Sequence, residues 1–268
     1  MSKEKYIETG TILDAICHRK MQRVADISTA TYDKWKAGCM TTEHAKSSRL
    51  ANALLLKKPG VIAEIKKASP SEGVIRPDTD VAAIAREYAE NGAAAISVVT
   101  EKDFFQGDTS WIHAVKKTVS LPVLRKDFIM DEKQVYESKM AGADAVLLIA
   151  AILNEQALGQ LYRLIYSLGM EALVEIRTRG ELDKAIGAGA RIIGINNRNL
   201  ENFKVGRDEF ISLVKHIPKD KIVVAESGIH SAEDLQFMIQ QGAHAALVGT
   251  YLMRSEHPGK ALKALYKI

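Results

Sequence analysis

The sequence predicts an α/β fold, a (β/α)8 TIM barrel with an N-terminal helical extension, from three observations. First, short apolar runs rich in Val and Ile alternate with longer helical patterns, as buried parallel strands and their crossover helices do. Second, a glycine–alanine phrase recurs at Gly92, Gly142, Gly189 and Gly242, after a helical pattern and before an apolar run. Third, several apolar runs end in a charged or hydrogen-bonding side chain. Charges that emerge together at one end of the strands describe the mouth of a barrel.

Eight βα units follow one another from residue 61 onward. We expect strands near residues 61–66, 95–99, 122–126, 145–149, 171–176, 192–196, 222–226 and 245–249. We expect helices near residues 80–91, 110–119, 131–141, 154–168, 179–188, 207–217, 231–241 and 258–266. The alternative is an open doubly wound sheet, which would show a glycine-rich turn after its first strand. Here Lys67-Ala68-Ser69-Pro70 follows that strand, so a closed barrel is favoured.

The first 57 residues lie outside this repeat and form the expected extension of a single barrel domain that spans residues 1–268. Helical spacing predicts a helix from Thr11 through Ala25 and another from Thr42 through Leu56. A polar stretch that contains Trp35 and Gly38 joins them. These helices could plug one end of the barrel or form a lid over the substrate, and the two interpretations are compatible.

Composition and charge narrow the class of function. The 268 residues are 47% hydrophobic and 26% charged, which is typical of a globular enzyme. The 37 basic residues are spread among 33 acidic ones, so we expect a small anionic substrate and no nucleic-acid partner. Two cysteines outside any CxxC pair, no secretory signal and no apolar run of ~20 residues predict a cytoplasmic protein without a membrane partner.

Metal chemistry and the common nucleophile motifs find no support in the sequence. The seven histidines fall on helices, their flanks or turns, without the spacing of metal ligands. The chain has no Gly-x-Ser-x-Gly elbow, and neither cysteine is placed as a nucleophile. We therefore expect no metal site.

Side chains suited to acid–base catalysis gather at the predicted strand ends. They are Glu64 and Lys66, Lys126, Glu175, Asn196 and Arg198, and Glu226 with Ser227. Glu64 and Lys66 share a face because strand side chains alternate with period two. Carboxylates and ammonium groups brought together shift one another's pKa values, which can supply a general acid and a general base near neutral pH. The alternative is a structural ion-pair network, which would explain one or two such residues more easily than a cluster drawn from several strands.

Small residues after the last two strands predict a phosphate site. Ser227-Gly228 follows the seventh strand and Gly249-Thr250 the eighth, where barrels often bind phosphate with backbone N–H groups. A tight turn that needs glycine is the alternative. The hydroxyls of Ser69-Pro70-Ser71 could also bind an anion, and Phe104-Phe105 could stack on an aromatic substrate or anchor their loop in the core.

Four motifs closely resemble those of indole-3-glycerol phosphate synthase, and the resemblance covers nearly the whole chain from about residue 11. The motifs are Ala63-Glu64-Ile65-Lys66-Lys67-Ala68-Ser69-Pro70-Ser71, Leu124-Arg125-Lys126-Asp127-Phe128-Ile129, Gly194-Ile195-Asn196-Asn197-Arg198-Asn199-Leu200 and Ala225-Glu226-Ser227-Gly228-Ile229. The resemblance implies ring closure of 1-(2-carboxyphenylamino)-1-deoxyribulose 5-phosphate to indole-3-glycerol phosphate, with loss of carbon dioxide and water. It implies a step of tryptophan biosynthesis that uses no metal and no organic cofactor.

The resemblance also implies roles for the site residues. Lys126 would protonate the ribulose carbonyl oxygen, Glu175 would handle the proton transfers of dehydration, and Lys66 would be a further acid or a phosphate contact. Glu64, Asn196 and Glu226 would position the substrate and tune the lysines. Arg198 and Ser69 would bind around the anthranilate half, and Ser227, Gly228, Gly249 and Thr250 would hold the phosphate. One departure is Glu72, where family members often carry Lys, which would weaken steering of an anionic substrate.

Two other functions stay open from the sequence. A sugar-phosphate isomerase could use the same phosphate loops, but the isomerase of the neighbouring pathway step resembles this chain less, since it uses a cysteine where Glu64-Ile65-Lys66 stands. A catalytically silent phosphate-binding barrel is the second alternative, and the joint presence of Lys66, Lys126 and Glu175 argues against it. We expect a monomer or a weak homo-oligomer.

Overall fold

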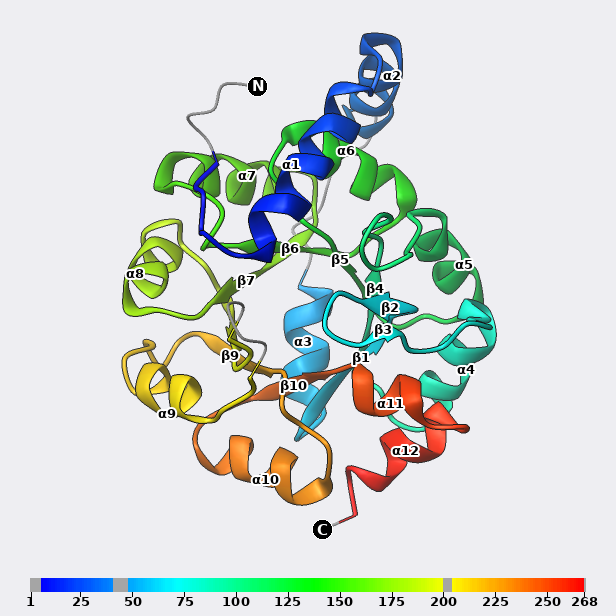
Figure 1. Cartoon of the computed structure of the whole chain (residues 1–268), viewed down its shortest axis with the longest axis vertical. Helices are drawn as coiled ribbons and strands as arrows, with labels where there is room; N and C mark the ends of the chain where they lie inside the picture. The colour runs from blue at the N-terminus through cyan, green and yellow to red at the C-terminus, as the bar shows by residue number, and fades with distance from the viewer. Residues whose placement is uncertain (1–5, 41–47, 200–203, 268) are drawn as a thin grey trace.

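The computed structural model describes residues 6–40, 48–199 and 204–267 (Figure 1). Eight parallel strands close into a barrel in the order β1-β10-β9-β8-β7-β6-β5-β4. Their bounds are β1 (Gly60–Ile65), β4 (Ala95–Val99), β5 (Val123–Lys126), β6 (Ala145–Ile149), β7 (Glu171–Ile176), β8 (Ile192–Asn196), β9 (Ile222–Glu226) and β10 (Ala245–Val248). The predicted (β/α)8 barrel is confirmed, and each predicted strand end is correct to within one residue.

The eight predicted crossover helices surround the barrel (Figure 1). They are α4 (Val81–Glu90), α5 (Ser110–Thr118), α6 (Glu132–Ala141), α7 (Glu155–Ser167), α8 (Arg179–Gly187), α9 (Asp208–Val214), α10 (Ala232–Gln240) and α12 (Pro258–Ala264). Most begin where a polar side chain can cap free backbone N–H groups: the side chains of Asp80 and Asn154, for example, accept from the third residue after each. Helix α6 ends at Gly142, whose φ of 92° is the left-handed conformation that glycine adopts without strain.

Two short elements were not expected from the sequence. A two-stranded hairpin, β2 (Ala68–Ser69) with β3 (Gly73–Val74), follows β1, and helix α11 (Thr250–Arg254) follows β10 directly. Neither is long enough to produce a hydrophobic period that a sequence pattern could reveal. The hairpin puts Ser69 in a paired strand, and α11 begins at Thr250, one of the predicted phosphate contacts.

The N-terminal extension contains α1 (Ile12–Ala25), α2 (Thr29–Met40) and α3 (Arg49–Leu56). The predicted first helix is confirmed. The expectation of a polar connection around Trp35 and Gly38 was wrong, because these residues lie within α2, which packs against α6 with little apolar periodicity of its own. The last predicted helix begins at Arg49 rather than Thr42, and residues 42–47 of that expectation lie outside the described residues.

Helices α1 and α3 lie at opposite ends of the barrel. Ile12 and Ile16 of α1 line the cavity into which the carboxyl ends of the strands open. Helix α3 instead packs against the start of β1, and its backbone N–H groups at Leu50 and Ala51 donate to the buried carboxylate of Glu171, the first residue of β7. A carboxylate at a helix N-terminus is favoured by the helix dipole. The extension therefore supplies both a plug at one end and a cover at the other.

Apolar side chains fill the barrel and the layer between strands and helices. Ile62, Ile96, Leu124 and Ile193 are fully buried in the strands, and burial of such a side chain contributes about 1.5–3 kcal/mol. This rigid core fixes the strand ends that carry the polar cluster. No helix within the described part of the chain is long and apolar enough to span a membrane.

Candidate active site

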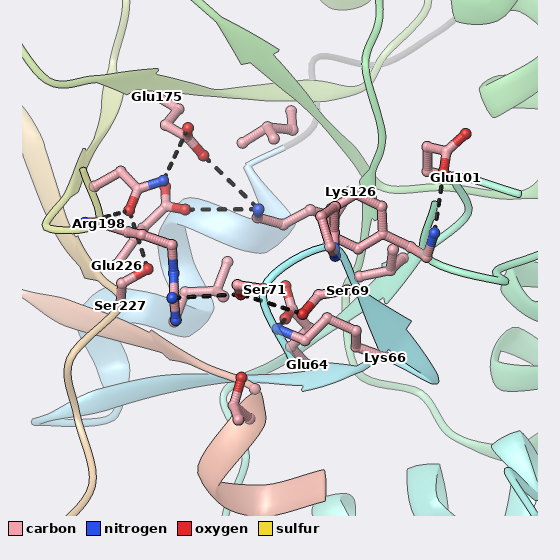
Figure 2. A pocket seen from close by; sticks show the side chains of 18 of the residues that line it. Glu64, Lys66, Ser69, Ser71, Glu101, Lys126, Glu175, Arg198, Glu226 and Ser227 are labelled. Carbon is pink, nitrogen blue, oxygen red and sulfur yellow. Dashed lines mark hydrogen bonds and ion pairs between the residues drawn. The ribbon is translucent and has the colours of Figure 1, made fainter. Parts of the chain in front are cut away.

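One cavity at the carboxyl ends of the strands collects the predicted site residues (Figure 2). All twelve line it: Glu64, Lys66, Ser69, Lys126, Glu175, Asn196, Arg198, Glu226, Ser227, Gly228, Gly249 and Thr250. They come from the ends of β1, β5, β7, β8, β9 and β10 or from the residues just after them. The convergence expected of a barrel mouth is therefore present, and the cluster is concentrated in a solvent-accessible cavity.

Lys126, the last residue of β5, projects into the centre of the cavity toward two carboxylates (Figure 2). Its Nζ lies 3.7 Å from Glu175 Oε2 and 4.0 Å from Glu226 Oε2, and 22% of its side chain is exposed. Burial lowers the pKa of Lys126, but the negative charges of Glu175, Glu64 and Glu226 outweigh it and raise that pKa above the ordinary value. The ammonium is therefore protonated at neutral pH and able to donate a proton.

Glu175 and Glu226 form a close pair of carboxyl groups that differ in their partners. Asn196 Nδ2 donates to Glu175 Oε1 at 3.1 Å, whereas Glu226 Oε1 is buried without a hydrogen-bond partner among the described residues. Burial, followed by the charge of Glu175, raises the pKa of Glu226 well above its usual range. Burial and the neighbouring carboxylate therefore disfavour the ionised form of Glu226.

Glu64 and Lys66 form the opposite wall of the cavity (Figure 2). Lys66 Nζ lies 2.8 Å from Glu64 Oε1, which confirms that the two side chains share a face. Burial would raise the pKa of Glu64, but Lys66 and then Lys126 lower it below its usual value. The cavity therefore has two ammonium groups, each with an acidic neighbour, on different strands.

Arg198 and three serines form the polar rim. Arg198 Nη1 donates to Ser71 Oγ at 3.5 Å, and Ser71 Oγ lies 3.5 Å from Ser69 Oγ. Asn196 Oδ1 accepts from both the Arg198 N–H and the Ser227 hydroxyl, each at 3.0 Å. The amide of Asn196 thus connects the guanidinium loop, the Ser227 turn and the Glu175 carboxylate. Leu200, the last residue of the sequence motif that begins at Gly194, lies outside the described residues.

Two glycines provide the space that two of the carboxylates occupy. A Cβ on Gly249 would lie 2.3 Å from Glu64 Oε1, and a Cβ on Gly194 would lie 2.0 Å from Glu226 Oε1. Sequence reasoning gave Gly249 a phosphate role only and missed Gly194 as a site residue. A glycine inside the strand Ile192–Asn196 was the available signal, because strand glycines often mark a close approach of another group.

The apolar wall was only partly expected. Phe105 lines the cavity with Phe128, with ring centroids 6.1 Å apart, whereas Phe104 packs at the core and does not line it. Ile12, Leu13 and Ile16 of α1 complete this wall, and sequence reasoning did not single them out. An aromatic ring bound between these groups would lie beside Lys126.

Other predicted features lie outside the cavity or were not found. Glu72, which was expected to weaken steering of the substrate, does not line the cavity. It pairs instead with Arg254 of α11. Within the described ranges no group of three or more His, Cys, Asp or Glu side chains could hold a metal ion.

Comparisons with known proteins show the family to which the chain is similar. The family model of indole-3-glycerol phosphate synthase matches residues 13–265. The indole-3-glycerol phosphate synthase of Carboxydothermus hydrogenoformans is 47% identical over 239 residues, which cover 86% of this chain and 90% of that relative. The one from Acetivibrio thermocellus is 43% identical over 248 residues, which cover 91% of this chain and 95% of the relative.

Solved structures support the fold independently. A crystal structure of 3-hexulose-6-phosphate synthase superposes with a TM-score of 0.62 at 17% identity, over 77% of this chain and 97% of that one. A similarity at this low sequence identity supports a shared barrel fold but does not indicate a shared reaction. Because the family model spans the barrel and the relatives are similar over most of their length, the chain belongs to the indole-3-glycerol phosphate synthase family.

Proposed function

We propose that Lys126 is the general acid of the reaction for which the family is named, and that Glu175 is its main partner in proton transfer. The chain is a carboxy-lyase of tryptophan biosynthesis that forms indole-3-glycerol phosphate. A sugar-phosphate isomerase and a silent phosphate-binding barrel are not favoured by the family membership.

Ring closure begins when Lys126 donates its proton to the carbonyl oxygen of the ribulose moiety. The carbonyl carbon then accepts the ring carbon that bears the carboxylate, and loss of carbon dioxide restores aromaticity. The raised pKa of Lys126 keeps its ammonium protonated before this step, and Glu175 at 3.7 Å keeps the ammonium oriented. General acid catalysis of this kind contributes on the order of 10²–10⁴-fold in rate.

Dehydration follows ring closure and needs a proton acceptor and a proton donor. Glu175 is the proposed acceptor, since Asn196 orients one of its oxygens and the other faces Lys126. Lys66, 2.8 Å from Glu64, is the proposed further acid or phosphate contact. Glu64, Asn196 and Glu226 position the substrate and adjust the charge around the two lysines.

The two ends of the substrate are assigned to opposite parts of the cavity. Arg198 and Ser69 bind around the anthranilate half, beside the wall that contains Phe105 and Phe128. The phosphate group lies against Ser227, Gly228, Gly249 and Thr250, where Ser227 and Gly228 have φ values of 65° and 81°. Two successive left-handed residues leave backbone N–H groups available to an anion, as in other phosphate turns.

We further propose that the chain folds as one barrel domain and acts in the cytoplasm without a metal or cofactor. It would be a monomer or a weak homo-oligomer. The two cysteines, Cys17 and Cys39, are buried and lie outside any CxxC motif, which suits a reduced compartment. Sedimentation at micromolar concentration would detect a strong dimer.

One observation carries the assignment: the Lys126 ammonium lies within 4.0 Å of carboxylates from two other strands at the mouth of the barrel. The purified chain should convert 1-(2-carboxyphenylamino)-1-deoxyribulose 5-phosphate into a product with indole fluorescence, with no metal added. Glu175→Gln should lower kcat by about 10²-fold if Glu175 handles a proton. An unchanged kcat would remove Glu175 from that role, and an absence of product from the wild-type chain would contradict the proposed reaction.

A further inference from the structure

A buried ion cluster beside the cavity is centred on Lys20 of α1, and its two acids, Glu101 and Asp127, line the cavity. Lys20 is only 6% exposed, and its Nζ lies 2.8 Å from Asp127 Oδ1 and 3.7 Å from Glu101 Oε1. Both carboxylates are fully or almost fully buried. A buried ammonium costs several kcal/mol unless it is paired, so this lysine is held by contacts to the two segments that carry these acids.

Asp127, the residue that follows Lys126, connects Lys20 to the segment after the proposed general acid. Its Oδ1 also accepts from the Phe128 N–H at 2.8 Å, and its Oδ2 accepts from the Thr100 hydroxyl at 2.6 Å and from Arg125 at 3.1 Å. The Asp127 side chain thereby fixes the backbone between Lys126 and the cavity-lining Phe128. Loss of the Lys20 charge would leave this carboxylate buried with Arg125 as its nearest cation.

Glu101 connects Lys20 to the loop that carries the other aromatic ring of the cavity. Its carboxylate accepts from three successive backbone N–H groups, those of Asp103 at 3.1 Å, Phe104 at 2.6 Å and Phe105 at 3.1 Å. Glu101 also lines the cavity, and Figure 2 shows it to the right of Lys126. The position of the Phe105 ring therefore depends on where the Glu101 carboxylate is held.

We infer that Lys20 is a positioning residue for the reaction: its ammonium holds the α1 wall, the Phe105 loop and the segment after Lys126 in one arrangement around the substrate. The inference rests on the proposed function, because these three segments line the proposed anthranilate side of the cavity. A lysine that only stabilised the fold would affect the unfolding temperature and leave substrate binding unchanged.

The test compares Lys20→Met with Arg23→Met in the full chain. Arg23 is a matched control because it lies one turn further along α1 and pairs with Asp103 of the same loop, its Nη2 2.6 Å from Asp103 Oδ1, but 37% of its side chain is exposed. An exposed pair contributes little, whereas removal of one partner of a buried pair is costly. We expect KM to rise about tenfold in Lys20→Met and less than about twofold in Arg23→Met.

The outcomes separate the inference from the proposed function. Turnover by the wild-type chain tests the reaction, and the ratio of the KM values tests Lys20. If Lys20→Met lowers the unfolding temperature but leaves KM and kcat within about twofold of wild type, the lysine is structural only and the inference is overturned. If the wild-type chain shows no turnover, the same comparison is made with the dissociation constant of the substrate from a fluorescence titration.

A second variant covers the case in which Lys20→Met does not fold. Glu101→Gln keeps the side-chain volume and leaves Lys20 paired with Asp127, but offers one acceptor oxygen where three N–H groups and an ammonium converge. KM should rise in this variant as well, by about three- to tenfold. An unchanged KM in folded Glu101→Gln would overturn the link between this cluster and the cavity wall.

Discussion

Gly194→Ala tests whether the Glu226 carboxyl must occupy one position beside Lys126. An added Cβ would lie 2.0 Å from Glu226 Oε1 and 3.3 Å from Leu173 Cδ1. Because Cβ atoms essentially never approach another atom within 3.0 Å, the oxygen must retreat by about 1 Å. The carboxyl is the end of a flexible side chain, so the backbone of β8 can stay in place and the fold should survive.

Gly194→Ala should therefore lower kcat more than it lowers the stability of the fold. Displacement of a positioned group by about 1 Å can lower a rate by about 10²-fold, which corresponds to about 3 kcal/mol in the barrier. Glu226 Oε2 is 4.0 Å from the Lys126 ammonium, so a shift of this size changes the charge environment of the general acid. We expect kcat to fall by about two orders of magnitude while the unfolding midpoint changes by a few degrees.

Steady-state kinetics and thermal unfolding of the same preparations measure both quantities. Gly187→Ala is the control, because a Cβ at Gly187, at the end of α8, meets no atom within 4 Å. That variant should keep the wild-type kcat. A Gly194→Ala enzyme with wild-type kcat and an intact fold would refute the reasoning, since the Glu226 carboxyl would then tolerate displacement.

Three further predictions follow from charges at or near the cavity. Lys126→Ala should lower kcat by about 10²-fold or more, and near wild-type turnover would remove Lys126 as the general acid. Thr250→Glu should raise KM by repelling the phosphate, and an unchanged KM would move the phosphate site away from α11. Burial raises the pKa of Asp127, but Lys20 and Arg125 lower it to about 2. Its ionised form thus stabilises the fold above pH 4, and this stability is lost as pH falls toward 2. The free energy of unfolding, measured with denaturant, should decrease by about 2 kcal/mol over this fall in pH in the wild type and by less in Asp127→Asn.

The strand ends could be predicted from sequence because two simple rules apply to them. Apolar runs in a parallel barrel are buried on both faces, so a charged residue in such a run marks the point at which the strand emerges. Period two then puts Glu64 and Lys66 on one face, and their 2.8 Å contact agrees with this rule. Closure of the barrel brings Lys126, Glu175 and Glu226 together without any further information.

The features that the sequence did not reveal depend on contacts between distant segments. Lys20 lies on a surface-like helical pattern, and its burial results from packing against Glu101 and Asp127, more than 80 positions away. Helix α2 has no strong apolar stripe, because it contacts little besides α6. The role of Gly194 depends on the rotamer of Glu226 on the neighbouring strand, which no local pattern encodes.

The two glycines answer one physical question, namely how several charged groups fit in the mouth of a small barrel. Acidic and basic side chains meet there: the Lys126 ammonium lies within 4.0 Å of Glu175 and Glu226, and the Lys66 ammonium lies 2.8 Å from Glu64. Burial and the charge of Glu175 raise the pKa of Glu226, so the charged form of this carboxyl is disfavoured. Gly194 and Gly249 leave the space that the Glu226 and Glu64 carboxyl oxygens occupy. Two missing methyl groups therefore help to determine where the acidic partners of the two lysines lie.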